Sequence, residues 1–328
     1  MLQRHPSEQL RLFDFGLSLS VIREESRKLE ASDCAAHTQE AYVYAWRIFT
    51  RWCERVGKTP LPAEFLTVED FITWAAIVRE DGAPYRPKTI RLFLAAITKQ
   101  HKVHGFGSPV SNRARLLLSN AERNPVSESK RKEAITPDLL MRLCKVWAGE
   151  ELLSIRNRSM IALGFAGGFR RSEVMGLELR DIHVQGSELA VFLRKSKTDQ
   201  KFVGRTVIVQ AARNKVACPL RQLERWLEVR SDWAGPLFCA ARNNALQNQF
   251  IGGSALCSAV QEGLRRLGVE SHVYGAHSLR SGFVTAAAAN GASELAIRSR
   301  TGHKQIAALA YYVRDQQGLR INPLKGVL

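Results

Sequence analysis

Residues 188–209, ELAVFLRKSKTDQKFVGRTVIV, are the stretch where the hydrophobic pattern changes from a helical period to a strand-like alternation. The apolar runs 188–193 and 203–209 predict two strands. The polar segment 195–201 lies between them, so the stretch predicts a hairpin with a basic tip. Because the chain on both sides shows helical spacing, we expect a mainly α fold with a small antiparallel β-sheet in its second half.

Apolar residues at three- and four-residue steps predict helices on both sides of this hairpin. In the second half of the chain, the predicted helices begin near Thr136, Ile155, Pro219, Ser254 and Ser278. In the first half, they begin near Thr38, Thr67, Pro87 and Arg113. Thr67 is predicted to cap the N-terminus of its helix.

A polar stretch, PVSESKRKEA at residues 125–134, separates the two halves. Its composition is typical of a linker, and it contains three consecutive basic residues, Lys130, Arg131 and Lys132. Residues at the start of the chain show no clear period. We therefore expect an N-terminal arm (1–30), a helical domain (31–124), a basic linker (125–134) and a second domain with a C-terminal tail (135–328).

The charge of the 328-residue chain points to a polyanionic partner. It has 48 Lys and Arg against 31 Asp and Glu, a formal net charge of +17. Residues 1–130 hold 19 basic and 15 acidic side chains, a net charge of +4, whereas residues 131–328 hold 29 and 16, a net charge of +13. Nucleic acid is the expected partner, bound most intimately by the second domain. No apolar run approaches the roughly 18 residues of a membrane span, so no membrane partner is expected.

Several other classes of site lack their motifs. The six cysteines are scattered without a CxxC pair, which predicts reduced, mostly buried thiols. The first residues show no secretory signal, so a cytoplasmic, DNA-associated protein is expected. His101 and His104 are predicted to lie on a helix surface and not to bind zinc. The chain has no G-x-x-x-x-G-K-[ST] sequence and no carboxylate cluster, so we expect no ATP, metal or other cofactor.

Five short motifs in the second domain contain residues that suit phosphate chemistry. They are GFRRSE with Arg170 and Glu173, KSKTD with Lys197, HSLR with His277 and Arg280, Gly302-His303, and Tyr311-Tyr312. Each motif alone is more often an ordinary helix start, a basic turn or a core tyrosine. Together, the arginines match phosphate oxygens, and histidine and lysine can move protons. A tyrosine hydroxyl can attack phosphorus where positive charge stabilises the phenolate.

In this order, the motifs resemble those of the tyrosine recombinase (phage integrase) superfamily, which includes the site-specific recombinase Cre. The boxes that carry the resemblance are Arg170-x-Ser172-Glu173, His277-x-x-Arg280, Gly302-His303 and Tyr312. The steps of 23 residues from Arg280 to His303 and 9 residues from His303 to Tyr312 are those expected of the family. The resemblance covers residues 36–320; it is specific in the catalytic half and architectural in the helical half.

The resemblance implies a mechanism on DNA. Arg170 and Arg280 would clamp the scissile phosphate, and His303 would hydrogen-bond a non-bridging oxygen. Tyr312 would attack phosphorus, giving a 3′-phosphotyrosyl link and a free 5′-hydroxyl. Since one phosphodiester replaces another of similar energy, religation would need neither ATP nor metal.

The same resemblance implies roles in proton transfer. Lys197 would protonate the leaving oxygen, and His277 would assist proton transfer at the tyrosine. Glu173 would orient Arg170 or His277 from behind. The hairpin loop also holds two alternatives to Lys197, namely Lys195 and Lys201.

Two further assignments have close neighbours. The family places the catalytic arginine two residues before the serine, which favours Arg170 over Arg171. Adjacent residues of a helix point about 100° apart, so only one of two neighbouring tyrosines can face the phosphate. The spacing from the upstream histidine selects Tyr312, which leaves packing as the role of Tyr311.

The resemblance also implies an assembly. The helical domain, similar to SAM-like core-binding domains, and the catalytic domain would form a C-shaped clamp around duplex DNA that carries a recombination site. The apolar tail after Tyr312 would dock on a neighbouring protomer, giving a homotetramer on paired sites from a monomeric or weakly associated free protein. Candidate DNA contacts are Arg86, Lys88, Arg91, Lys130, Arg131 and Lys132. A solvated helix face explains the first three equally well.

Three competing functions differ from site-specific recombination. A type IB topoisomerase-like nicking-closing enzyme would share the residue set and would relax DNA without a defined site. A non-catalytic DNA-binding relative would be expected to have lost at least one member of the set. A basic protein that binds RNA or acidic surfaces is supported by net charge alone.

Overall fold

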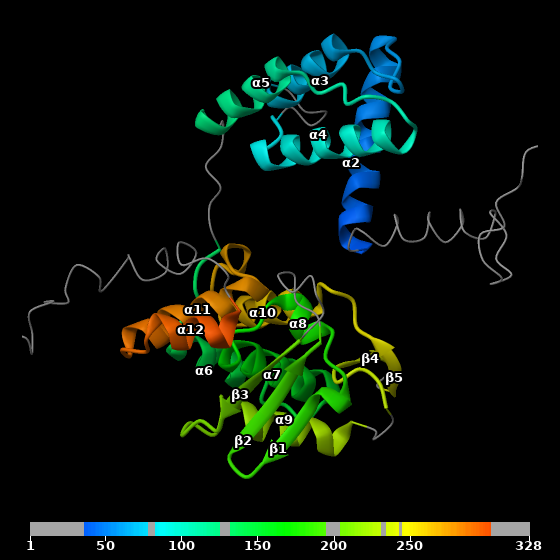
Figure 1. The fold of residues 1–328 in the computed structure, drawn as a ribbon. Coiled ribbons are helices and arrows are strands. Elements are labelled where there is room, and N and C mark those ends of the chain that lie inside the picture. Colours follow the sequence, from blue (N-terminus) through cyan, green and yellow to red (C-terminus); the bar gives the residue numbers. More distant parts are fainter. Residues whose placement is uncertain are drawn as a thin grey trace, which may run out of the picture. The chain divides into compact units, whose positions relative to one another are not determined.

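The computed structural model describes residues 36–77, 83–124, 132–194, 204–230, 234–242 and 245–302 (Figure 1). The chain divides into two compact units, Met1–Ser129 and Lys130–Leu328. The first unit is helical, and the second combines helices with small antiparallel sheets.

The four predicted helices of the first unit are confirmed. They are α2 (Ala36–Val56), α3 (Phe65–Ile77), α4 (Pro87–Val103) and α5 (Asn112–Arg123). Their apolar stripes meet in a core of aromatic rings, in which Phe71 packs against Phe49 and Phe93 with ring centroids 5.0 and 5.4 Å apart. Edge-to-face and tilted pairs at these distances add to the free energy gained by burying the rings.

Two details of this unit differ from the sequence prediction. Thr67 is not a cap: α3 begins two residues earlier, because the amide of Val68 already bonds to the carbonyl of Glu64, and Thr67 is buried within the first turn. His101 is not on the surface. Its Nδ1 bonds to the Ile97 carbonyl at 2.8 Å, and its Nε2 accepts from the amide of Ala63, in the loop between α2 and α3, at 2.9 Å, so the buried ring is fully paired.

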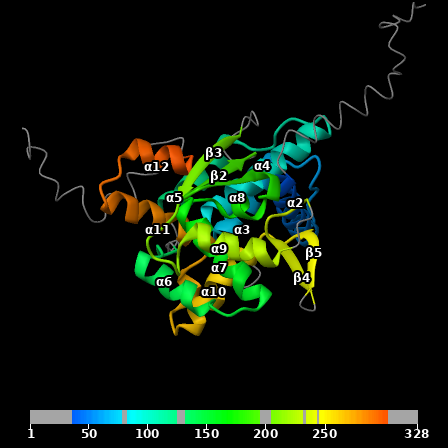
Figure 2. The same ribbon diagram turned by 90° about the horizontal axis from the view of Figure 1, so that it is seen from below.

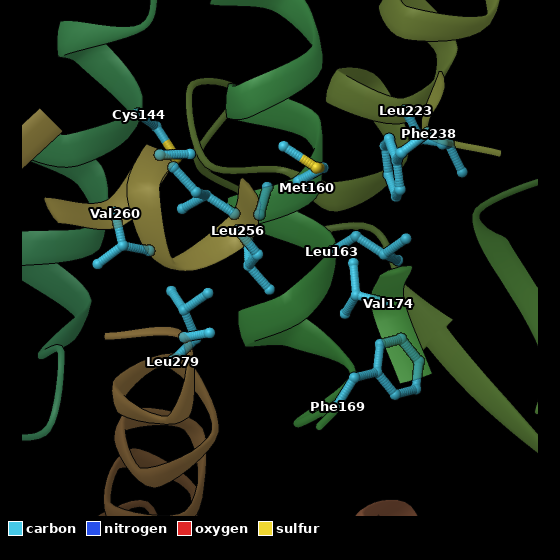
Figure 3. Close-up of a cluster of buried hydrophobic side chains, with 14 of the residues drawn as sticks. Cys144, Met160, Leu163, Phe169, Val174, Leu223, Phe238, Leu256, Val260 and Leu279 are labelled. Carbon is cyan, nitrogen blue, oxygen red and sulfur yellow. The ribbon is translucent and has the colours of Figure 1, made fainter. Parts of the chain in front are cut away.

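The second unit is built around α7 (Leu152–Ala166), a helix buried on nearly all sides. The other helices are α6 (Pro137–Val146), α8 (Arg171–Met175), α9 (Pro219–Val229), α10 (Ala255–Arg266), α11 (Ala276–Ala289) and α12 (Glu294–Thr301), with 3₁₀ turns η1 (Leu179–Asp181) and η2 (Ser271–Val273). Figure 3 shows Met160 and Leu163 of α7 between Cys144 and Leu256 on one side and Phe238 on the other. Helices α11 and α12 lie beside each other in both ribbon views (Figures 1 and 2).

The predicted hairpin is confirmed as β2 (Glu188–Leu193) and β3 (Arg205–Gln210). These strands form the antiparallel sheet β1-β2-β3 with β1 (Ile182–Gln185), and a second sheet pairs β4 (Cys239–Arg242) with β5 (Ala245–Phe250). In β3, alternate residues from Arg205 to Val209 face the protein interior, and Leu193 pairs with Arg205. The inward arginine at the start of this strand is unusual and bears on the site described below.

The cysteine thiols agree with the sequence prediction. Of the cysteines in the described residues, Cys53, Cys144, Cys218 and Cys239 are buried and free, and Cys257 is free and partly buried. Burial raises the pKa of Cys144 to about 12. Among the described residues, every helix is too short or too polar to cross a membrane.

Residues 132–136 run along the start of α11. The amide of Ile135 bonds to the Ser278 carbonyl at 3.0 Å, and the Tyr274 hydroxyl donates to Glu133 at 2.8 Å. A Cβ atom built on Gly282 would lie 2.0 Å from the carbonyl oxygen of Ile135. The helix can approach this segment only because residue 282 has no side chain.

The substitution Gly282→Ala is therefore expected to lower the free energy of unfolding by about 1–3 kcal/mol, because the added methyl group overlaps backbone. This loss is net of the gain of about 1 kcal/mol that alanine brings to a helix interior, because the overlap with backbone costs more than the gain. Urea unfolding measures the change. Gly252→Ala is the control, since a Cβ there meets no atom within 4 Å. Equal unfolding midpoints for the two variants would contradict the close approach.

Candidate active site

A tight turn after α7 begins the site. Gly168 has a φ of +59°, and a Cβ there would lie 2.7 Å from Phe283. Glycine is therefore required both by the backbone conformation and by the contact with α11. The buried guanidinium of Arg280, on α11, donates from Nη1 to the Gly168 carbonyl at 2.8 Å. This bond fixes the N-terminal part of α11 against the turn between α7 and α8.

Arg170 precedes α8, where Glu173 in the first turn holds it. One Glu173 oxygen accepts from the Arg170 amide and the other from its Nη1, both at 2.7 Å. The Glu173 side chain is 1% exposed and that of Arg170 is 19% exposed. The carboxylate sits at a helix N-terminus, where the free amides favour negative charge. Of the two predicted partners for Glu173, the hydrogen bonds identify Arg170.

His277 lies in the first turn of α11, one turn before Arg280, and stays exposed at the surface. Partial loss of water around its ring lowers its pKa, and the positive charges of Arg280 and Arg170 lower that pKa further. A lowered pKa favours the neutral imidazole, which can accept a proton. The positive charges of both arginines therefore act on the same histidine.

The C-terminal end of α12 also contacts Arg170. Gly302 closes the helix in the left-handed conformation, with a φ of +65°, and Arg170 Nη2 donates to its carbonyl at 3.2 Å. Gly302 directly precedes His303. The structure thus brings together Arg170, Glu173, His277 and Arg280. Three predicted catalytic residues, Lys197, His303 and Tyr312, lie outside the described residues.

The predicted DNA contacts are dispersed. Arg86, Lys88 and Arg91 are exposed at the start of α4 in the first unit, and Arg91 is paired with Glu122. Lys132 bonds to the carbonyl of His272 in the second unit. Lys130 and Arg131 lie outside the described residues. Among the described residues, no group of three or more His, Cys, Asp or Glu could hold a metal ion.

Arg205 is a further residue of this site, and no short sequence motif marks it. Its Nη2 lies 3.7 Å from Glu173, and its Nη1 donates to the carbonyls of Ser299 and Arg300 at the end of α12. The sequence does indicate its orientation. Arg205 alternates with Val207 and Val209 along the strand, so its side chain lies on the same inward face as theirs.

Glu173 is the shared acceptor of this cluster, so Glu173→Ala is expected to lower the free energy of unfolding by about 2–3 kcal/mol. The loss arises because Arg170 and the partly buried Arg205 keep their charges without the carboxylate between them. Thermal or urea unfolding measures it. The control Glu228→Ala breaks an exposed pair with Arg225 and is expected to cost less than about 1 kcal/mol. Equal losses in the two variants would contradict a shared buried acceptor.

The chain is similar in sequence to known proteins over most of its length. Residues 133–318, more than half of the chain, match the model of the phage integrase family. The chain is 29% identical over 303 residues to an integrase/recombinase xerD homolog of Selenomonas ruminantium, covering 91% of this chain and 87% of that protein.

Solved structures show the same fold. The Tn1549 transposon integrase in complex with transposon right end DNA has a TM-score of 0.60 at 16% identity and is matched over 88% of this chain and 92% of its own. The XerH site-specific recombinase bound to its difH substrate has a TM-score of 0.55 at 16% identity, over 81% and 72%. The mainly helical fold with small antiparallel sheets is thus that of known recombinases, and the chain belongs to the phage integrase family.

Proposed function

We propose that this protein is a site-specific DNA recombinase that cleaves and rejoins duplex DNA through a covalent 3′-phosphotyrosyl intermediate on Tyr312. The observation that carries the proposal is the arrangement at the turn after α7: Arg280 bonds to the Gly168 carbonyl, Arg170 follows that glycine by two residues, and His277 lies one turn before Arg280 on α11. Two guanidinium groups and one imidazole are what the transesterification of a phosphodiester needs: charge to stabilise the pentacoordinate phosphorus and a base for the nucleophile.

Arg170 and Arg280 lie in different environments, which suits them to hold different sides of the scissile phosphate. Arg280 is almost fully buried and anchored through Nη1, so its position is fixed before DNA arrives. Arg170 keeps 19% of its side chain exposed and is oriented by Glu173. Preorganised donors of this kind stabilise charge that develops in the transition state without a cost of reorganisation at that moment.

The bonds and protons balance without a further reactant. The Tyr312 oxygen forms a bond to phosphorus as the bond between phosphorus and the 5′ oxygen breaks. The tyrosine proton passes to His277, and the leaving 5′ oxygen takes a proton from Lys197. His303 hydrogen-bonds a non-bridging oxygen. Attack by a 5′-hydroxyl on the phosphotyrosine reverses each step and rejoins the strand.

The relatives support a specific duplex as the substrate. XerH is a site-specific recombinase bound to its difH substrate, and the Tn1549 integrase is in complex with transposon end DNA. For the present chain, we propose duplex DNA with a defined recombination site, bound by a homotetramer when two sites are paired. The net charge of +13 on residues 131–328 supports close contact of the second unit with the DNA backbone.

Covalent capture tests this function and identifies the DNA site in the same experiment. The full chain is incubated with genomic DNA of its source that carries random nicks, in the presence of EDTA and without ATP. At a cleaved bond close to a nick, the short downstream strand diffuses away and the protein stays attached to a 3′ end. Detergent, stringent washing and sequencing of the linked fragments then give the sequence around the cleaved bond.

The proposal predicts linked fragments that share one common sequence at the cleaved bond. Absence of any protein–DNA adduct would overturn it. Adducts with no shared sequence, together with relaxation of any supercoiled plasmid, would replace it with a topoisomerase-like nicking-closing activity. Recovery only when Mg²⁺ is added would contradict the metal-free mechanism.

A further inference from the structure

Two arginines connect β3 to the end of α12 through backbone carbonyls. Arg205 of β3 donates from Nη1 to the Ser299 carbonyl at 3.3 Å and to the Arg300 carbonyl. Arg300 of α12 donates from Nη2 to the Ile208 carbonyl of β3 at 2.7 Å. Each arginine thus bonds to the main chain of the other's element, so side-chain hydrogen bonds in both directions join β3 to the last turn of α12.

Of these two arginines, Arg205 also reaches the cluster of Arg170, Glu173, His277 and Arg280. Its Nη2 lies 3.7 Å from the Glu173 oxygen that accepts from the Arg170 amide. A Cβ built on Gly302 would lie 3.1 Å from Arg205 Nε, so the guanidinium lies directly against the Gly302 backbone. Arg170 Nη2 donates to the carbonyl of the same glycine. Arg205 therefore contacts both the carboxylate that orients Arg170 and the backbone of Gly302, the residue before His303 in the sequence.

The environment of Arg205 is costly for a residue that only stabilises the fold. Its Nε and Nη2 atoms are buried; in the described part of the structure Nε has no hydrogen-bond partner, and Nη2 has only the Glu173 carboxylate oxygen 3.7 Å away. Loss of water around the guanidinium lowers its pKa, an effect that the Glu173 charge partly opposes. Buried donors without acceptors destabilise a protein by about 1–3 kcal/mol each. Such groups call for an explanation, and one explanation is a role in the reaction.

We propose that Arg205 is a positioning residue of the recombination reaction: it holds Gly302, and through it the start of the segment that carries His303, in register with Arg170 and Glu173. This inference rests on the proposed function. Arg205 acts on the side of the site that clamps the non-bridging oxygens, because its contacts are to Glu173 and to residues 299–302.

The kinetic test uses the DNA recovered by covalent capture, rebuilt as a nicked duplex that traps the adduct. Arg205→Gln removes the charge and the fork, and Arg205→Lys keeps the charge but not the planar fork. Arg213→Gln, at an exposed position of the same unit, is the matched control for net charge. Adduct formation is measured in a single turnover at saturating protein, and DNA affinity is measured separately.

Arg205→Gln is expected to slow adduct formation by about 100-fold, the size of effect that a misplacement of about 1 Å produces. Arg205→Lys is expected to fall between Arg205→Gln and the wild type. DNA affinity is expected to stay within about threefold of wild type. Arg205 contacts protein groups, and affinity comes from many phosphate contacts, of which the substitution would change one at most. A wild-type rate for Arg205→Gln, or a loss in affinity that accounts for the slower rate, overturns the positioning role.

A sulfur substrate tells which side of the site Arg205 serves. When sulfur replaces the bridging 5′ oxygen, the leaving thiolate needs no proton, so a defect confined to the lysine of the hairpin is relieved. Because Arg205 contacts the α12 side, we expect the sulfur substrate to leave the Arg205→Gln defect in place. Full rescue by sulfur would assign Arg205 to the hairpin lysine and overturn the inference as stated.

Hydrogen exchange on the free protein separates this inference from the proposed function. In Arg205→Gln, amides of residues 294–302 are expected to exchange at least about tenfold faster, while those of α7 stay unchanged. If the wild type forms no adduct, the proposed function fails. The inference fails separately if exchange over residues 294–302 is the same in the variant and the wild type.

Discussion

The substitution Tyr312→Phe is expected to abolish covalent protein–DNA adducts on the captured site while leaving DNA affinity unchanged. Phenylalanine keeps the ring and its packing but has no hydroxyl, so no bond to phosphorus can form. Adducts are read as protein-linked DNA on a denaturing gel, and affinity is read by a mobility shift. The change from complete trapping to background makes this the largest effect expected of any single substitution.

Tyr311→Phe is the matched control, because it removes the same atom from the adjacent residue. It is expected to trap DNA at the wild-type rate. If Tyr311→Phe loses the adduct and Tyr312→Phe retains it, the nucleophile is Tyr311. If both variants retain the adduct, the intermediate is not a phosphotyrosine at this position.

The second large effect is expected for Arg280→Lys, which should slow adduct formation by about 1,000-fold, the upper range for loss of one preorganised donor to a developing anion. Arg280 is 2% exposed and spends Nη1 on the Gly168 carbonyl. A lysine has one ammonium group, which cannot hold this anchor and present a planar fork to a phosphate at the same time. Single-turnover trapping on the captured duplex measures the rate.

Arg171→Lys, at an exposed position beside Arg170, is the control and should trap DNA at the wild-type rate. A charge-removing variant adds an independent readout. Because the positive charge of Arg280 helps to hold the pKa of His277 below its usual value, Arg280→Gln should raise that pKa toward about 6.5. The imidazole proton titration by NMR measures this shift. An unchanged pKa would contradict the proximity of the two side chains.

Hydrophobic periodicity predicted most of the fold because the elements concerned carry their own signal. The hairpin β2–β3 alternates apolar residues, and Thr136 caps α6 through a bond to the Leu139 amide at 3.2 Å. Strands β1, β4 and β5 and helix α12 were not predicted. β4 has the sequence CAAR, whose strand form depends on pairing with β5 and on Arg156, which donates to the Cys239 carbonyl at 2.9 Å. Tertiary partners of this kind leave no local pattern.

The site was predictable to the extent that it consists of short motifs in a fixed order. Arg170, His277 and Arg280 lie together as the motif order implied, because α7, α8 and α11 pack around one turn at Gly168. The sequence left two candidates, Arg170 and His277, for the residue that Glu173 orients. Hydrogen-bond geometry was needed to choose between them. Arg205 was missed because it belongs to no motif, and its only signal is the parity with which a strand turns its charge inward.

Segment 132–136 attaches the chain that follows the linker to the start of α11. Ile135 bonds to Ser278, between His277 and Arg280, and Glu133 bonds to the carbonyl of Val273 just before α11. Segment 132–136 is therefore hydrogen-bonded to the part of the chain that presents His277 and Arg280, two side chains proposed to act on the scissile phosphate. A displacement of segment 132–136 would therefore act directly on the part of α11 that carries His277 and Arg280.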